Sequence, residues 1–139
     1  MGRLQIGFSR LDITPPLGTH MAGYYVERLA EGILDPLEVN AVAVSDGERT
    51  AILFSCDIIG ICQKLMDSYR HRVAADNGLE EEAVFIACTH THTGPCVGRN
   101  EEDDPSYDGL LGRKLSDAAR LAIADLHPAS LSVGRGEAE

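Results

Sequence analysis

Two histidines separated by one residue are the side chains best suited to chemistry in this sequence. His90 and His92 belong to the stretch THTHTGP at 89–95, which directly follows an apolar run. Side chains of an extended chain alternate between two sides, so both imidazoles are expected on the same side. A neutral imidazole nitrogen is a good zinc donor, and catalytic zinc sites commonly use three protein ligands and leave one position for water. The motif therefore predicts part of a zinc site, with the neighbouring threonines as candidates to orient the rings.

The alternative is that the two histidines end a strand and simply face solvent. Three further residues also have two open interpretations. Asp12 either forms an Asx-type turn or contributes to a polar site. Asp57 either orients a histidine as a second carboxylate or caps the helix that follows it. His20 either reaches the site or lies free on the surface.

The first half of the chain predicts strands separated by loops. An opening strand is expected at about 4–8, and the loop at 12–18 contains two consecutive prolines, which suit neither a helix nor a central strand. A long irregular segment follows. Apolar residues at 39–44 and 50–59 then flank a turn at 45–48, which predicts a β-hairpin.

The second half predicts two helices and two more strands. Apolar residues at helical spacing indicate an amphipathic helix over 61–77, and Gly78 suits a left-handed C-cap. The apolar run 83–89 predicts a strand buried on both faces and central in the sheet. A second long helix is expected over 107–126, followed by a strand at 129–133. Together these elements predict an α/β domain, a mixed sheet with a hairpin and helices packed on it in two or three layers.

Composition excludes several classes of protein. The chain has 139 residues, a formal net charge of −10 and 44% hydrophobic residues, as expected for one globular domain. Nucleic-acid binding needs a basic patch, which is absent from the sequence. The longest apolar run, 83–88, is far shorter than the roughly 20 residues of a transmembrane helix, and no secretory signal is present. The four cysteines are interpreted as reduced, mostly buried thiols of a cytoplasmic protein, with a disulfide framework as the alternative: Cys56, Cys62, Cys88 and Cys96.

Several short motifs occur together in a recognisable order. They are Gly7, DITP at 12–15, MAGY at 21–24, DPL at 35–37 and THTHTGP at 89–95. Taken together they resemble the N-terminal part of the neutral/alkaline non-lysosomal ceramidase family. That family has an Asp-Ile-Thr opening, a Met-x-Gly-Tyr loop and a Thr-His-Thr-His-Ser-Gly-Pro motif in the same order. The resemblance spans nearly the whole chain, and the histidine motif is its most specific part.

The resemblance implies a zinc-dependent amidohydrolase that cleaves the amide of an N-acyl sphingoid base. The first histidine of the family motif is a zinc ligand, which carries over to His90. The second lies in the same site, which carries over to His92 as a further metal-site residue and as the catalytic candidate. His92 would stabilise a developing oxyanion or move a proton. Zinc would activate a bound water near neutral pH.

The sequence departs from the family in three ways. Thr93 replaces a serine, and Cys96 and Val97 stand where the family tends to continue with glycines. Family members also run to several hundred residues and place a further histidine, a glutamate and a tyrosine of the zinc site well downstream. We therefore expect residues 1–139 to be a single domain, the N-terminal portion of a larger hydrolase, and expect the isolated chain to be inactive.

A second hypothesis belongs to a different class of function. The same strand-end loop would serve a non-catalytic α/β module that binds a ligand or partner. For the enzyme, the expected partner is a small amide or lipid-like molecule, without nucleic acid and without a transmembrane segment. The sequence leaves self-association into a homo-oligomer open.

Overall fold

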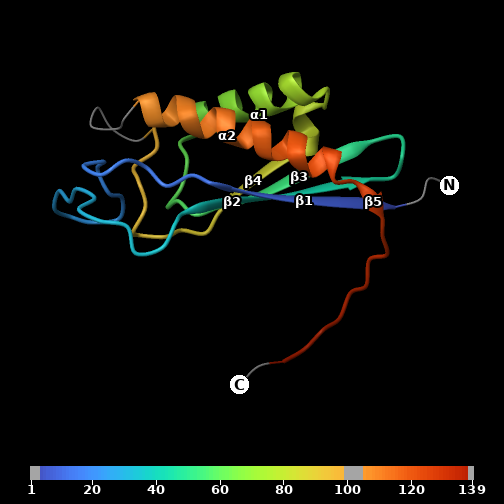
Figure 1. Cartoon of the computed structure of the whole chain (residues 1–139), viewed down its shortest axis with the longest axis horizontal. Coiled ribbons are helices and arrows are strands. Elements are labelled where there is room, and N and C mark those ends of the chain that lie inside the picture. The colour runs from blue at the N-terminus through green and yellow to red at the C-terminus, as the bar shows by residue number, and fades with distance from the viewer. Residues whose placement is uncertain (1–3, 99–104, 138–139) are drawn as a thin grey trace.

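The computed structural model describes residues 4–98 and 105–137. Five strands form one mixed sheet in the order β4-β3-β2-β1-β5, and both described helices pack on the same face (Figure 1). The fold is therefore a two-layer α/β arrangement, which confirms the fold class predicted from the sequence. No helix in the described part of the chain has the length and apolar character that crossing a membrane requires.

Three antiparallel strands form the middle of the sheet, between β4 at one edge and β5 at the other. β1 (Gln5–Asp12) pairs with β2 (Glu38–Ser45), and β2 pairs with β3 (Thr50–Cys56). The hairpin closes where Ser45 lies opposite Thr50, at the turn that the sequence predicts. Side chains of β2 alternate strictly between buried and half-buried, because one face of the sheet is covered by helices and the other is not.

A crossover through a helix adds β4 (Val84–Cys88) parallel to β3. The crossover is α1 (Gln63–Asn77), followed by the short 3-10 turn η1 (Glu81–Ala83). α1 ends at Gly78, whose φ of 66° is left-handed and whose N–H donates to the Ala74 carbonyl. This C-cap confirms the role predicted for that glycine.

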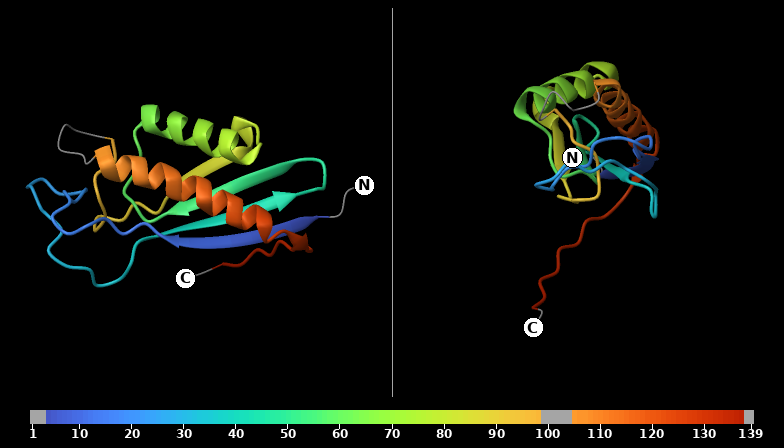
Figure 2. Two further views of the ribbon diagram at one scale, coloured as in Figure 1. Left: turned by 45° about the horizontal axis from the view of Figure 1, so that its top comes forward. Right: turned by 90° about the vertical axis from the view of Figure 1, so that its left-hand side faces the viewer.

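The prediction for β4 is wrong in its position and burial. β4 lies at an edge of the sheet, and Phe85 in its middle is 64% exposed. The strand register explains the exposure. Across the four neighbouring strands β4, β3, β2 and β1, one row of opposed residues consists of Phe85, Leu53, Val42 and Phe8. These four side chains form an apolar row on one face of the sheet, where Phe8, Leu53 and Phe85 are exposed. The described helices cover the opposite face, as the ribbon in Figure 2 shows. A continuous apolar run therefore marks apolar faces on both sides of this strand, not burial on both sides.

The long helix α2 (Pro105–Ala124) supplies most of the cover for the sheet. Five residues of the stripe that the sequence predicts are fully buried, namely Leu111, Leu115, Ala118, Ala119 and Ala122. The sixth, Leu126, lies beyond the end of the helix and is half-buried. β1 approaches it so closely that a Cβ at Gly7 would collide with the backbone of the last turn, at the Ala122 carbonyl. Ser9 reinforces this contact, since its hydroxyl donates to the Ala118 carbonyl at 2.7 Å.

The strand predicted at 129–133 is wrong. β5 is the two-residue strand His127–Pro128, which pairs antiparallel with the beginning of β1. Beyond it the chain runs extended and makes no described strand, and Leu131 and Val133 are 73% and 93% exposed. Alternating apolar residues predict a strand only when a sheet edge is there to pair with them.

Candidate functional site

The 89–95 loop begins where β4 ends, and a backbone turn at His90 shapes it. His90 has a φ of 64°, a left-handed conformation that few residues other than glycine adopt. Two backbone hydrogen bonds hold this turn in place. The N–H of Thr89 donates to the Cys56 carbonyl at 2.9 Å, and the N–H of His90 donates to the Ile58 carbonyl at 3.1 Å. The loop is thereby tied to the segment that follows β3.

Each imidazole of the pair is held through one of its two nitrogens. His90 Nδ1 lies 2.9 Å from the Ile59 carbonyl oxygen, and His92 Nδ1 lies 3.1 Å from the Gly23 carbonyl oxygen. A carbonyl oxygen only accepts, so both Nδ1 atoms donate. In the neutral ring the lone pair is then on Nε2, which is the tautomer that zinc-binding histidines commonly have when their other nitrogen is hydrogen-bonded.

The two rings lie next to each other and are exposed to solvent. Their centroids are 5.2 Å apart with 64° between the ring planes. The sequence correctly predicts two neighbouring imidazoles, but the reason it offers is wrong. Strand alternation does not bring them together, because β4 has ended and the chain turns at His90. Their different carbonyl partners determine where each ring lies.

Two threonines of the motif hydrogen-bond to each other rather than to the rings. Thr91 and Thr93 hydrogen-bond to each other through their hydroxyls at 2.9 Å. The Thr93 N–H also approaches the Thr91 hydroxyl at 3.3 Å. The rings are instead held by the backbone carbonyls of Ile59 and Gly23, which take the orienting role that the sequence suggests for hydroxyls.

The 21–24 segment lies directly against the histidine loop. The Ala22 N–H donates to the Gly94 carbonyl at 2.9 Å, and Met21 forms an isolated β-bridge with Pro95. Tyr24 approaches the His92 ring edge-on with centroids 6.5 Å apart, and the Arg28 guanidinium lies 4.4 Å from the centre of the Tyr24 ring. Two motifs about 70 residues apart in the sequence thus form one structure.

The DIT motif builds the platform beneath this structure. The Thr14 hydroxyl accepts from the Leu37 N–H at 2.8 Å, and the Ile13 N–H donates to the Leu37 carbonyl at 2.8 Å. Tyr107 on α2 donates its hydroxyl proton to the Ile13 carbonyl at 2.6 Å. Burial raises the pKa of Tyr107, so that hydroxyl stays protonated and remains a donor. These contacts join β1, β2 and α2 at the end of the sheet that carries the histidines.

Asp12 has the structural role that the sequence allows for it. Its carboxylate accepts from the Thr14 N–H at 2.7 Å, which is an Asx turn. Hydrogen bonds from the Thr14 side chain and backbone lower the pKa of Asp12 below its ordinary value. Asp12 is therefore a charged turn residue in the neutral pH range.

Neither interpretation of Asp57 agrees with its contacts. Its carboxylate accepts from the Glu38 N–H at 3.1 Å, and its own N–H donates to the Glu38 carbonyl at 2.9 Å. The N-cap residue of α1 is Cys62, which makes no side-chain cap. Asp57 thus joins β2 to the end of β3. His20 pairs with Glu27 at 3.4 Å through Nδ1, so it has a surface partner rather than a place beside the other two rings.

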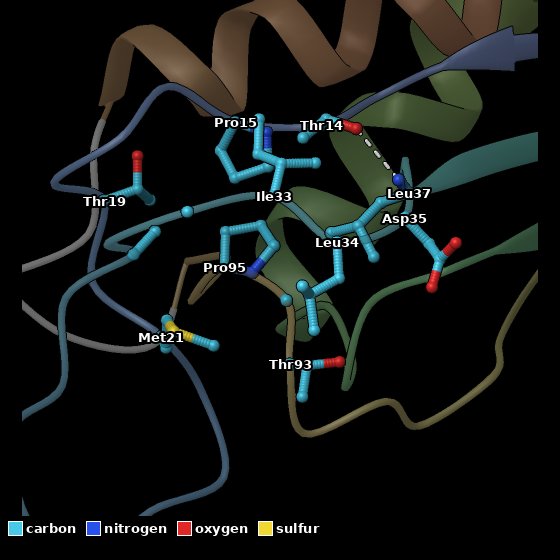
Figure 3. A pocket seen from close by; sticks show the side chains of 13 residues that line it. Thr14, Pro15, Thr19, Met21, Ile33, Leu34, Asp35, Leu37, Thr93 and Pro95 are labelled. Carbon is cyan, nitrogen blue, oxygen red and sulfur yellow. Dashed lines mark hydrogen bonds between the residues drawn. The ribbon is translucent and has the colours of Figure 1, made fainter.

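A cavity of about 300 Å³ opens next to the histidine loop. Figure 3 shows Met21, Ile33, Leu34 and Pro95 around it, and Thr93 and Gly94 of the histidine motif are also part of its wall. The lining is mostly apolar. The sequence does not predict this cavity, because the 32–35 stretch has no periodic pattern. Its one sign in the sequence is the pair of apolar residues Ile33 and Leu34, which the structure leaves exposed.

The described residues fit part of a zinc site. Two neutral imidazoles with free Nε2 lone pairs are zinc donors, whereas no group of three or more His, Cys, Asp or Glu within 4–98 and 105–137 is placed to hold a metal. None of the four cysteines, all of which lie in the described ranges, forms a disulfide, and Cys56 alone among them is buried. Burial raises the pKa of Cys56 to about 12, which keeps this thiol protonated and unsuited to binding a metal.

Comparisons with known proteins identify the fold. No protein-family model matches the chain, and no curated protein sequence matches it. Solved structures do match, and two ceramidases are among them. The crystal structure of neutral ceramidase from Pseudomonas aeruginosa has a TM-score of 0.80, and a ceramidase complexed with C2 has a TM-score of 0.78. Each match is 22% identical and covers 92% of this chain but 22% of the solved chain. The chain thus spans less than a quarter of the length of these structures, and it has the fold of one part of a neutral ceramidase.

Proposed function

We propose that this chain is the N-terminal portion of a zinc-dependent amidohydrolase that resembles neutral ceramidase. One observation carries the proposal: His90 and His92 lie side by side, and each uses Nδ1 to donate to a backbone carbonyl, which leaves the Nε2 atom of each ring as the potential ligand. The fold similarity to neutral ceramidase supports the same assignment.

In this proposal His90 and His92 have different roles at the zinc site. Zinc supplies polarisation of an amide carbonyl and a bound water of lowered pKa. His90 holds the ion through Nε2. His92 has one Nε2 lone pair, so at any moment it serves either as a second ligand or as the group that moves a proton and stabilises the oxyanion. The threonine hydroxyls of the loop are polar groups near the entrance to the site.

The adjacent cavity suggests where the rest of a substrate would lie. It shares Thr93, Gly94 and Pro95 with the histidine loop, and its other walls are largely apolar. A substrate with an amide at the histidines and a hydrocarbon portion in the cavity would gain the free energy of burying apolar surface. A lipid-like N-acyl amide fits this description.

Within the described residues the proposed zinc site is incomplete. A catalytic zinc site commonly needs three protein ligands, and the described residues bring two together. We therefore expect zinc binding without turnover from these 139 residues alone. A cytoplasmic location is part of the proposal and agrees with four cysteines that form no disulfide with one another.

Zinc content of the purified chain tests the proposal. Equilibrium dialysis followed by mass spectrometry of the metal is expected to give one zinc per chain, and His90→Ala is expected to lose it. His71→Ala is the matched control, because that ring lies on α1 and pairs with Glu81 at 2.7 Å. An assay for fatty acid released from an N-acyl sphingoid base is expected to show none.

The second candidate function is a non-catalytic module that binds a ligand through the same loop. The apolar cavity beside the loop is the observation that favours it. It predicts the same zinc content in His90→Ala as in the unchanged chain, and that result would reject the enzyme hypothesis.

A further inference from the structure

The position of His92 depends on one residue in a distant part of the chain. Gly23 supplies the carbonyl that accepts from His92 Nδ1 at 3.1 Å. It also has a φ of 90°, so its backbone lies in the left-handed region. A Cβ added to Gly23 would lie 2.5 Å from Nδ1 and 2.6 Å from Cγ of the same ring. The His92 ring therefore occupies space that is free only because residue 23 is glycine.

We infer that Gly23 is a positioning residue for His92, holding the ring by its carbonyl and admitting it by lacking a side chain. Because the carbonyl accepts from Nδ1, it selects the tautomer with the proton on Nδ1 and the lone pair on Nε2. The inference rests on the proposed function for its consequence in zinc binding. Its structural part, the tautomer and place of His92, stands independently of any metal.

The backbone around Gly23 has little freedom to move away from the ring. The preceding residue, Ala22, is 2% exposed and donates its N–H to the Gly94 carbonyl. Met21 is bridged to Pro95, and the Cys96 N–H donates to the His20 carbonyl at 3.0 Å. A side chain at position 23 would therefore displace the exposed imidazole rather than the segment.

The effect on His92 can be separated from any effect on His90. His90 donates to the Ile59 carbonyl, in the segment after β3, and no atom of His90 is among the three nearest to a Cβ built on Gly23. Within the described residues, His90 and Tyr24 also make ring contacts with His92. A methyl group added at Gly23 would therefore be directed at the His92 ring and not at the His90 ring.

Long-range ¹H–¹⁵N NMR of the imidazole nitrogens tests the inference on the metal-free full chain. At about pH 8, above the ordinary histidine pKa of about 6.5, each neutral ring reports which nitrogen carries the proton. We expect Nδ1–H for both His90 and His92 in the unchanged protein. In Gly23→Ala we expect the His92 signals to shift to the Nε2–H form or to a mixture, with His90 unchanged.

Two glycines of similar backbone conformation provide controls. Gly47, with a φ of 92°, lies in the hairpin turn, and Gly18, with a φ of 83°, lies in the same long loop as Gly23. A Cβ at either meets nothing within 4 Å. Gly47→Ala and Gly18→Ala therefore introduce the same backbone strain without the contact, and both should keep the His92 tautomer.

Each outcome decides the inference. An Nε2–H form of His92 in the unchanged protein overturns it, whether or not the variant folds, and so does a His92 tautomer that is the same in Gly23→Ala. A shift that also occurs with Gly47→Ala overturns it in favour of general strain. Zinc titration then measures the consequence, an expected loss of about 10–100-fold in affinity for Gly23→Ala. Failure of the unchanged chain to bind zinc would reject the proposed function but leave the tautomer result valid.

Discussion

At the scale of single residues, the main feature of the site is the backbone at His90. Non-glycine residues in sparsely populated conformations cost on the order of 1–3 kcal/mol and persist where surrounding contacts hold them. His90, with its φ of 64°, is the one non-glycine residue of the described chain with a positive φ. The strained residue is thus the one that the sequence motif marks as a metal ligand, which is typical of functional positions.

Replacing His90 by asparagine separates function from stability. Asparagine tolerates the left-handed region better than most residues, so strain falls while the hydrogen bond to the Ile59 carbonyl is lost. These effects oppose each other, and we expect the free energy of unfolding to change by less than about 1 kcal/mol. Urea denaturation measures it, and metal analysis should show that zinc is lost. A destabilisation of more than about 2 kcal/mol would mean that the ring is structural.

Asp12 leads to a prediction about pH. Its pKa is lowered in the folded protein by hydrogen bonds from Thr14, so the ionised form stabilises the fold. This contribution is present above the ordinary carboxyl pKa of about 3.9 and is lost as the pH falls through the lowered folded value. Asp12→Asn should therefore be less stable than the unchanged protein at pH 7, with the difference shrinking below about pH 4. Denaturation at pH 7, 5 and 3 gives the comparison, and a difference that grows on acidification would contradict it.

At the scale of elements, the sequence predicts best what depends on local patterns. The hairpin, both helices and the Gly78 cap follow from turn residues and apolar periodicity, and all are present. Where a partner decides the outcome, local patterns fail. The edge position of β4 depends on which strands lie beside it. The missing strand at 129–133 depends on whether an edge is available to it.

The contact between β1 and α2 leads to a prediction at this scale. Gly7 faces backbone atoms of the last turn of α2 and the residues just after it, which cannot rotate away as a side chain could. Gly7→Ala must move the strand and helix apart, with an expected loss of about 1–3 kcal/mol in the free energy of unfolding. Gly32→Ala is the control, because a Cβ there meets nothing within 4 Å and its φ is not positive. Equal stability of the two variants in urea denaturation would refute this account of the packing.

At the scale of the whole molecule, the site joins parts of the chain that the sequence keeps far apart. The motif at 89–95 can be predicted as a candidate site because its two histidines are only two positions apart in the sequence. Their partners could not, because Ile59 and Gly23 act through main-chain carbonyls, which every residue has. The motifs at 12–15 and 35–37 prove to be the platform, linked through Leu37. The resemblance to the ceramidase family predicts the order of these motifs along the chain but not their contacts.

X-ray absorption spectroscopy at the zinc edge tests the central claim most directly, because it counts the atoms around the metal in the zinc-loaded chain. The account predicts two imidazole nitrogens at about 2.0–2.1 Å, with the remaining positions filled by light atoms of solvent. His90→Ala should lose this imidazole signal, and His71→Ala should keep it. A shell of sulfur at about 2.3 Å, or a spectrum of hydrated zinc without imidazole, would contradict the claim that His90 and His92 share one ion.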